Sequence, residues 1–323
     1  MISIIGEGLI DFIARTSEDA SVVFDSYIGG CGLNTATAAA RLGSSVGFMG
    51  KLSSDMFGER IIGHLVDNQI MFDPDLCAVP LPSLIGFASL DAEGKASYAF
   101  YCKGTAPVSY TKQELLDTLV LHSDLRVVHI GSVALSVEPG CDAILDALSD
   151  LEIKPVVFLD PNVRPAVIED LDLHRVRIER ALGMADMVKL SDEDLLLLYP
   201  GCDAESKAAS LAGERGLEVI LTLGKKGSIW FTASGKRFAQ PIIDLPLVDT
   251  VGAGDTFSGA LLSYLHEHAC FGEDGQLPLF APLSDEVIRQ ALRYATGASA
   301  INCSRKGCNP PTKAEVLDLI GSV

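Results

Sequence analysis

A glycine-rich run that contains an aspartate stands near the carboxyl end of the chain, at Asp249–Phe257. The N–H groups that begin a helix have no intrahelical partners, and Gly252 and Gly254 would let a ligand approach the backbone closely. The run therefore predicts a site for a phosphate or a developing oxyanion. Apolar residues follow at the spacing of a helix with one buried face: Phe257, Ala260, Leu261, Tyr264 and Leu265.

Asp255 has no obvious purpose in a plain anion site, because a carboxylate repels a bound phosphate. Its position is explained if it takes a proton from a hydroxyl that attacks the phosphate. Aspartate is also a favoured residue at the start of a helix, where it accepts hydrogen bonds from the backbone. The local sequence alone is equally compatible with Asp255 as a cap.

Two further motifs stand near the N-terminus. Gly29 and Gly30 precede a small-residue helix expected over Thr35–Leu42, and Asn34 offers an amide that can bind neighbouring hydroxyls. Asp11 follows the first expected strand, where it could accept hydrogen bonds from a polyol. Simple helix packing and a solvated loop aspartate are the alternatives. Asp11 also stands where a GxGxxG fingerprint needs its third glycine, which argues against a dinucleotide-binding dehydrogenase.

Short β-branched runs alternate with helical patterns, which predicts an α/β fold with a mainly parallel sheet covered by helices on both faces. The strands are expected at Ile2–Ile5, Val46–Met49, Val127–Ile130, Val156–Leu159, Met187–Leu190 and Val219–Leu223. The helices are expected at 55–68, 112–121, 138–150, 203–215 and 284–301.

Two segments do not fit this alternation, 11–28 and 84–108, and the second contains a hairpin with its turn at 91–94. They predict a small sheet that covers a ligand at the carboxyl edge of the main sheet, or alternatively a surface hairpin used only for dimer contact. We expect one domain over 1–323.

Composition argues against several classes of protein. The chain has 43 acidic and 25 basic residues and a net charge of −18, which disfavours nucleic acids and anionic membranes as partners. The first residues do not have the pattern of a signal peptide, and no apolar run has the length of a membrane span, so a cytoplasmic location is expected. The eight cysteines show no CxxC spacing and are expected to be mostly buried thiols.

Together these motifs resemble the ribokinase/PfkB carbohydrate kinase family over essentially the whole chain, with two family signatures at Gly29–Gly43 and Asp249–Leu262. The resemblance implies a ribokinase-like three-layer sandwich with a β-lid, and phosphoryl transfer from ATP to a sugar hydroxyl with Mg²⁺. We also expect a homodimer through that lid. The resemblance further implies that Asp255 is the catalytic base. The implied anion hole is Gly252, Ala253 and Gly254, and the implied sugar site is Asp11, Gly29, Gly30, Asn34, Phe100 and Asp255.

The middle of the chain is similar to the same family. Asp160–Arg164 resembles the D-P-N-x-R element of fructokinases and 2-keto-3-deoxygluconate kinases, which implies that Arg164 steadies the phosphoryl group or the substrate. Asp194 is implied to act on Mg²⁺ indirectly, through water. Implied nucleotide contacts are Lys189, Ser191, Thr222, Gly224, Gly227, Gly254 and Asn302. An implied site for a monovalent cation such as K⁺ lies at Asp249, Val251 and Gly307.

The substrate is indicated by the segment Phe100–Lys103. Fructokinases commonly have arginine where this chain has Cys102, and a sugar acid would require a firm cation. The absence of that arginine favours fructose over 2-keto-3-deoxygluconate, although Lys103 could take its place. A catalytically silent sugar- or nucleotide-binding protein is the alternative from another class. It would predict the loss of Asp255 or of the anion-hole glycines, and both are present.

Overall fold

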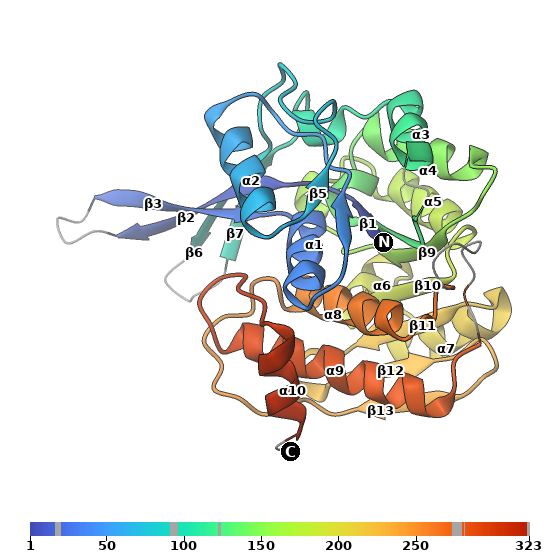
Figure 1. Cartoon of the computed structure of the whole chain (residues 1–323). Coiled ribbons are helices and arrows are strands. Elements are labelled where there is room, and N and C mark those ends of the chain that lie inside the picture. The colour runs from blue at the N-terminus through green and yellow to red at the C-terminus, as the bar shows by residue number, and fades with distance from the viewer. Residues whose placement is uncertain (17–20, 91–95, 122–123, 273–279, 281, 322–323) are drawn as a thin grey trace.

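The chain folds around a nine-stranded sheet (Figure 1) in the computed structural model, which describes residues 1–16, 21–90, 96–121, 124–272, 280 and 282–321. The strand order is β13-β12-β11-β10-β9-β8-β1-β4-β5. Strand pairs from β11 to β5 are parallel, whereas β12 and β13 are antiparallel at one edge. The bounds are β1 Ile2–Ile5, β4 Val46–Phe48, β5 Met71–Phe72, β8 Val127–Gly131, β9 Val156–Asp160, β10 Met187–Ser191, β11 Glu218–Thr222, β12 Ser228–Phe231 and β13 Arg237–Gln240.

Helices cover both faces of this sheet, which gives three layers. One face packs on α1, α2, α8, α9 and α10, and the other packs on α3 to α7. Strands buried on both faces need apolar residues at nearly every position, which explains the short β-branched runs. The bounds are α1 Cys31–Arg41, α2 Met56–Asp67, α3 Lys112–Leu121, α4 Gly140–Asp150, α5 Leu171–Leu182, α6 Asp192–Leu198, α7 Ala204–Arg215, α8 Ala253–Glu267, α9 Asp285–Cys303 and α10 Lys313–Gly321. Among the described residues, none of these helices is long and apolar enough to span a membrane.

A second sheet is built from the two segments that did not fit the alternation. Its order is β3-β2-β6-β7, with β2 at Leu9–Thr16, β3 at Val22–Gly29, β6 at Ile85–Leu90 and β7 at Ala96–Tyr101. Figure 1 shows β2 and β3 as a ribbon that extends away from the three layers. The predicted turn at 91–94 lies outside the described residues. The covering role expected for 11–28 and 84–108 stays a prediction.

Two helix starts differ from the sequence expectation. The helix expected from Thr35 begins at Cys31, because Gly30 has a φ of 106°, which turns the chain directly from β3 into α1. The helix expected after Asp255 begins at Ala253. Asp255 therefore lies inside the first turn of α8.

Candidate active site

The start of α8 has the geometry of an open helix terminus. Gly252 is its N-cap, with a φ of 71°, and no side chain of the described residues caps the helix. A Cβ at Gly252 would lie 2.3 Å from the sulfur of Cys308, so the loop requires glycine there. A Cβ at Gly254 would lie 3.1 Å from Nζ of Lys189, which places an ammonium group against the first turn. Backbone donors, the helix dipole and this cation together favour an anion.

Asp255 is not the N-cap of α8, since Gly252 occupies that position. Nδ2 of Asn34 donates a hydrogen bond to Oδ2 of Asp255 at 2.8 Å. The side chain is 8% exposed, and burial raises the pKa of Asp255, assisted by the nearby charge of Asp160 and opposed by the Asn34 hydrogen bond. A carboxylate with a raised pKa is a stronger base. This arrangement favours proton transfer over the capping alternative.

The start of α1 is fixed by a buried carboxylate that the sequence analysis did not single out. The backbone N–H of Cys31 donates to Oε1 of Glu7 at 2.9 Å, and the N–H of Ala134 donates to Oε2 at 3.3 Å. Burial raises the pKa of Glu7 to about 7, although these hydrogen bonds act to lower it. Glu7 thus holds the turn of α1 that presents Asn34 to Asp255.

Asp11 lies on β2 between two glycines. A Cβ at Gly29 would lie 2.6 Å from Oδ2 of Asp11, and one at Gly86 would lie 2.6 Å from its Oδ1. Burial raises the pKa of Asp11 to about 6, with Arg164 lowering it and Asp255 raising it. The structure therefore brings Asp11, Arg164 and Asp255 into one electrostatic group. Gly86 was missed, although a glycine inside a strand is itself a sign of close approach.

The lid residues lie next to Asp11. Phe100 pairs with Gly86 across β6 and β7, and a Cβ at Gly86 would lie 2.9 Å from its ring. Cys102 follows β7 and is buried. Lys103 is exposed, and its Nζ forms an ion pair of 2.5 Å with Glu169. The cation that could replace a lid arginine is therefore engaged elsewhere on the surface.

A buried ion pair lies next to the start of α8. Nζ of Lys189, on β10, is 2.8 Å from Oδ2 of Asp160 at the end of β9, and Oγ of Ser258 donates to the same oxygen at 2.9 Å. Burial alone would lower the pKa of Lys189, but the charge and hydrogen bond of Asp160 outweigh it and raise the pKa. The charged Lys189 thus connects two strand ends to α8.

The other predicted nucleotide residues stand at neighbouring strand ends. Ser191 ends β10 and pairs with Thr222, which ends β11. Gly224 and Gly227 lie in the turn between β11 and β12, where a Cβ at Gly227 would lie 2.1 Å from the carbonyl oxygen of Gln240. The structure therefore assigns Gly227 to the close packing of this turn against β13.

Asp194, predicted to act on a metal ion through water, makes three hydrogen bonds within the protein. It accepts from the N–H of Val163 at 2.7 Å and from the N–H and hydroxyl of Ser191 at 2.9 and 2.7 Å. The backbone N–H of Asp194 donates to Oγ of Ser191 at 3.0 Å, which completes a capping box at α6. These bonds use three of the roughly four acceptor positions of the carboxylate, which favours an indirect role through water over direct metal ligation.

Two loops meet at the predicted monovalent-cation site. Oδ2 of Asp249 accepts from the N–H of Gly307 at 2.8 Å, and Oδ1 accepts from the N–H of Val251 at 3.0 Å. Asn302 is fully buried, donates to the carbonyl of Val251 at 2.9 Å and accepts from the N–H of Asn309 at 2.8 Å. These bonds bring Asp249, Val251, Gly307 and Asn302 together and hold the loop that enters α8.

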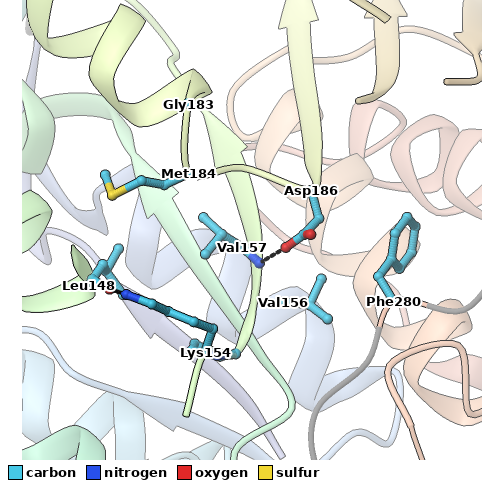
Figure 2. Close-up of a pocket in the computed structure, with 9 residues that line it drawn as sticks. Leu148, Lys154, Val156, Val157, Gly183, Met184, Asp186 and Phe280 are labelled. Carbon is cyan, nitrogen blue, oxygen red and sulfur yellow. Dashed lines mark hydrogen bonds between the residues drawn. The ribbon is translucent and has the colours of Figure 1, made fainter. Parts of the chain in front are cut away.

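A cavity of about 450 Å³ lies at the amino ends of the parallel strands, where β9 and β10 begin. Figure 2 shows Asp186 beside Val157, whose N–H donates to the Asp186 carboxylate at 2.8 Å. Lys154 and Phe280 also line this cavity. Parallel α/β sheets bind ligands at the carboxyl ends of their strands. This cavity lies at the amino ends, away from the candidate site.

Comparison with known proteins gives a consistent result. Residues 1–315 match the model of the pfkB family carbohydrate kinases. A fructokinase from Rhizobium leguminosarum bv. trifolii is 37% identical over 267 residues, which are 82% of this chain and 79% of that protein. A probable fructokinase-4 from Arabidopsis thaliana is 31% identical over 98% of this chain and 95% of that protein. The crystal structure of a fructokinase with bound ATP from Xylella fastidiosa superposes with a TM-score of 0.83 at 25% identity, covering 99% of this chain and 98% of that one.

Proposed function

The chain belongs to the pfkB family of carbohydrate kinases, and on that basis we propose that it transfers the γ-phosphoryl group of ATP to a hydroxyl of fructose. One observation supports this proposal above the others. A buried carboxylate, Asp255, is held by Asn34 in the first turn of a helix whose start has no side-chain cap among the described residues. Such a group can take a proton from a hydroxyl placed between it and an anion bound at the helix start.

The sugar is proposed to lie between the second sheet and the starts of α1 and α8. Asp11 and Asn34 offer a carboxylate and an amide to its hydroxyls, while Gly29, Gly30 and Phe100 shape the surface around them. Arg164 is exposed and its charge acts on Asp11, which supports a role in contacting the sugar or the transferring phosphoryl group. The second sheet would exclude water when both substrates are bound.

The proposed chemistry follows from where charge accumulates. Asp255 accepts the proton of the attacking hydroxyl, a contribution of about 10²- to 10⁴-fold in general acid–base catalysis. The backbone N–H groups of Gly252 and Gly254 are proposed to stabilise the charge that grows on the phosphoryl oxygens. The N–H of Ala253 donates to the carbonyl of Thr250 at 3.2 Å and would have to leave that bond to join them. Lys189 adds a fixed positive charge beneath Gly254. Ser191, Thr222, Gly224 and Asn302 are proposed to line the nucleotide side.

The residues proposed to act on metal ions suit Mg²⁺ and a monovalent cation to different degrees. Mg²⁺ would neutralise phosphate charge, and Asp194 is proposed to influence it through water, since three hydrogen bonds already occupy most of the acceptor positions of its carboxylate. Asp249 joins the loops of Val251 and Gly307, whose backbone oxygens would suit a monovalent cation such as K⁺.

Fructose is favoured over the sugar acid 2-keto-3-deoxygluconate by the charges near Phe100. Cys102 is buried and uncharged, and Lys103 is paired with Glu169, so neither offers a free cation to a carboxylate. A catalytically silent binding protein is disfavoured because Asp255 and its supports are all in place. The names of the fructokinase relatives support the same substrate.

An ADP-release assay across fructose, 2-keto-3-deoxygluconate, ribose, tagatose and adenosine tests this function. We expect the highest kcat/KM with fructose, and a lower kcat/KM for it in Arg164→Gln. The surface variant Arg237→Gln, which breaks an exposed pair with Glu205, is the matched control and is expected to behave as the wild type. ADP release with none of these acceptors, in the presence of Mg²⁺ and K⁺, would contradict the proposed activity.

We also propose that two copies of the chain pair through the second sheet. Its strands expose large apolar side chains, among them Val22, Phe24, Tyr98 and Tyr101. Val22→Asp is therefore expected to shift the protein toward monomer in sedimentation velocity. Val176→Asp, at an exposed valine of α5, is the control. A wild-type chain that sediments as a monomer would refute this pairing.

A further inference from the structure

Three buried side chains near Asp255 direct ligand atoms toward one another. One ligand atom each from Cys31, His129 and Asp160 lies within 4.8 Å of the other two, and all three residues are buried. They come from separate elements, since Cys31 begins α1, His129 lies on β8 and Asp160 ends β9. The mechanism proposed above uses none of their three ligand atoms.

Two of the three residues also have buried polar atoms without the partners that such atoms normally have. Neither ring nitrogen of His129 has a hydrogen-bond partner among the described residues, and the same holds for Oδ1 of Asp160. An unpartnered buried polar atom is costly, and many such atoms face a water or an ion. The ion pair with Lys189 uses the other carboxylate oxygen, Oδ2, so Oδ1 remains free to bind.

The protonation states suit a metal ligand set. Burial lowers the pKa of His129 to about 4, despite the opposing charge of Asp160, so its imidazole is neutral and can donate an electron pair. Burial and the neighbouring carboxylates raise the pKa of the Cys31 thiol, so the thiol holds its proton until a metal ion displaces it.

We propose that Cys31, His129 and Asp160 form a binding site for Zn²⁺ beside the catalytic carboxylate. Zinc takes sulfur, nitrogen and oxygen ligands at about 2.0–2.3 Å in a tetrahedron, which places ligand atoms roughly 3.5 Å apart. The three ligand atoms must therefore move closer to one another by about 1 Å when the ion binds. On binding, the Cys31 sulfur forms a bond to zinc and its proton passes to solvent. Three protein ligands leave the fourth position to water.

Occupation of this site would act on Asp255 directly. The Cys31 thiol hydrogen-bonds the Asp255 carboxylate and lowers its pKa, and the bound ion would remove that donor. Loss of the donor alone would raise the pKa of Asp255, but the double positive charge of the ion beside the carboxylate is the larger effect and makes it a weaker base. We therefore expect zinc to inhibit phosphoryl transfer. This effect rests on the proposed function, whereas the binding itself does not.

Binding is tested on the chelator-treated protein without nucleotide, with Co²⁺ as a spectroscopic probe for zinc. We expect one Co²⁺ per chain, a sulfur-to-cobalt charge-transfer band, the strong visible bands of tetrahedral cobalt, and displacement by one equivalent of Zn²⁺. Cys31→Ser and His129→Gln should each weaken binding by at least about a hundredfold, the upper end of the loss for outer-shell partners. Cys141→Ala, which removes a buried thiol from α4, is the matched control.

The outcomes separate the site from the activity. Co²⁺ spectra that lack the charge-transfer band, or that persist in Cys31→Ser with native circular dichroism, would overturn the zinc site whatever the kinase does. Zinc should inhibit ADP release in the wild type and in Cys141→Ala, and much less in Cys31→Ser, whose hydroxyl can still donate to Asp255. Equal inhibition of the wild type and both variants would refute the link to Asp255.

Discussion

Replacing Asp255 with asparagine is expected to lower kcat by about 10²- to 10⁴-fold, the usual contribution of a positioned general base. Asparagine has nearly the same shape and keeps an oxygen that can accept the Asn34 hydrogen bond, so the first turn of α8 should remain intact. The variant also removes a negative charge from the anion site. KM for ATP should therefore not rise, and steady-state kinetics with each substrate varied in turn will separate these effects.

Asp186→Asn is the matched control for that variant. Asp186 is also partly buried, and burial raises its pKa. It accepts a hydrogen bond from the N–H of Val157 at 2.8 Å (Figure 2). It directly precedes β10 and so lies at the amino ends of the strands, away from the candidate site. An asparagine there can accept the same hydrogen bond, so kcat should be unchanged. A kcat for Asp255→Asn within a factor of a few of the wild type, measured at several pH values, would refute the base assignment.

The sequence predicted the parts of the fold that depend on local pattern. The apolar runs of β1, β8 and β9 are buried on both faces of the sheet, so they read as strands without any knowledge of their neighbours. The presence of α8 was also predictable, because Phe257, Ala260 and Leu261 recur at helical spacing, although its first residue, Ala253, was not. In contrast, α5 contains several charged residues among its apolar ones, and β12 and β13 are short, so neither pattern was recognised.

The contacts that tune the site could not be predicted, because they join residues far apart in sequence. Nothing in the sequence indicates that Glu7 accepts the N–H of Cys31, or that Lys189 reaches Asp160. The glycine motif indicated that Asn34 lies near a helix start, and only the fold directs its amide to Asp255. Residue types and spacing thus predicted the chemistry, whereas the pKa of the base depends on tertiary packing.

The second large effect is expected on stability, from Lys189→Met. The Lys189 and Asp160 side chains are 5% and 0% exposed. Among the described residues, removing the ammonium leaves this buried carboxylate with Ser258 as its remaining side-chain partner. Breaking a buried pair in this way typically costs about 3–5 kcal/mol. We expect a loss of that size in the free energy of unfolding, measured by urea denaturation. The exposed pair of Lys236 and Asp285 is the control, and Lys236→Met should cost less than about 1 kcal/mol.

The double variant Lys189→Met with Asp160→Asn separates the two roles assigned to Lys189. Removing both charges leaves no unpaired buried ion. The double variant should therefore lose less stability than the sum of the losses in the two single variants. Activity should not recover in the double variant, because the ammonium beneath Gly254 is proposed to act on the phosphate as well as on Asp160. If stability and kcat recover together, Lys189 serves only to pair with Asp160, and the anion site consists of the backbone of α8 alone.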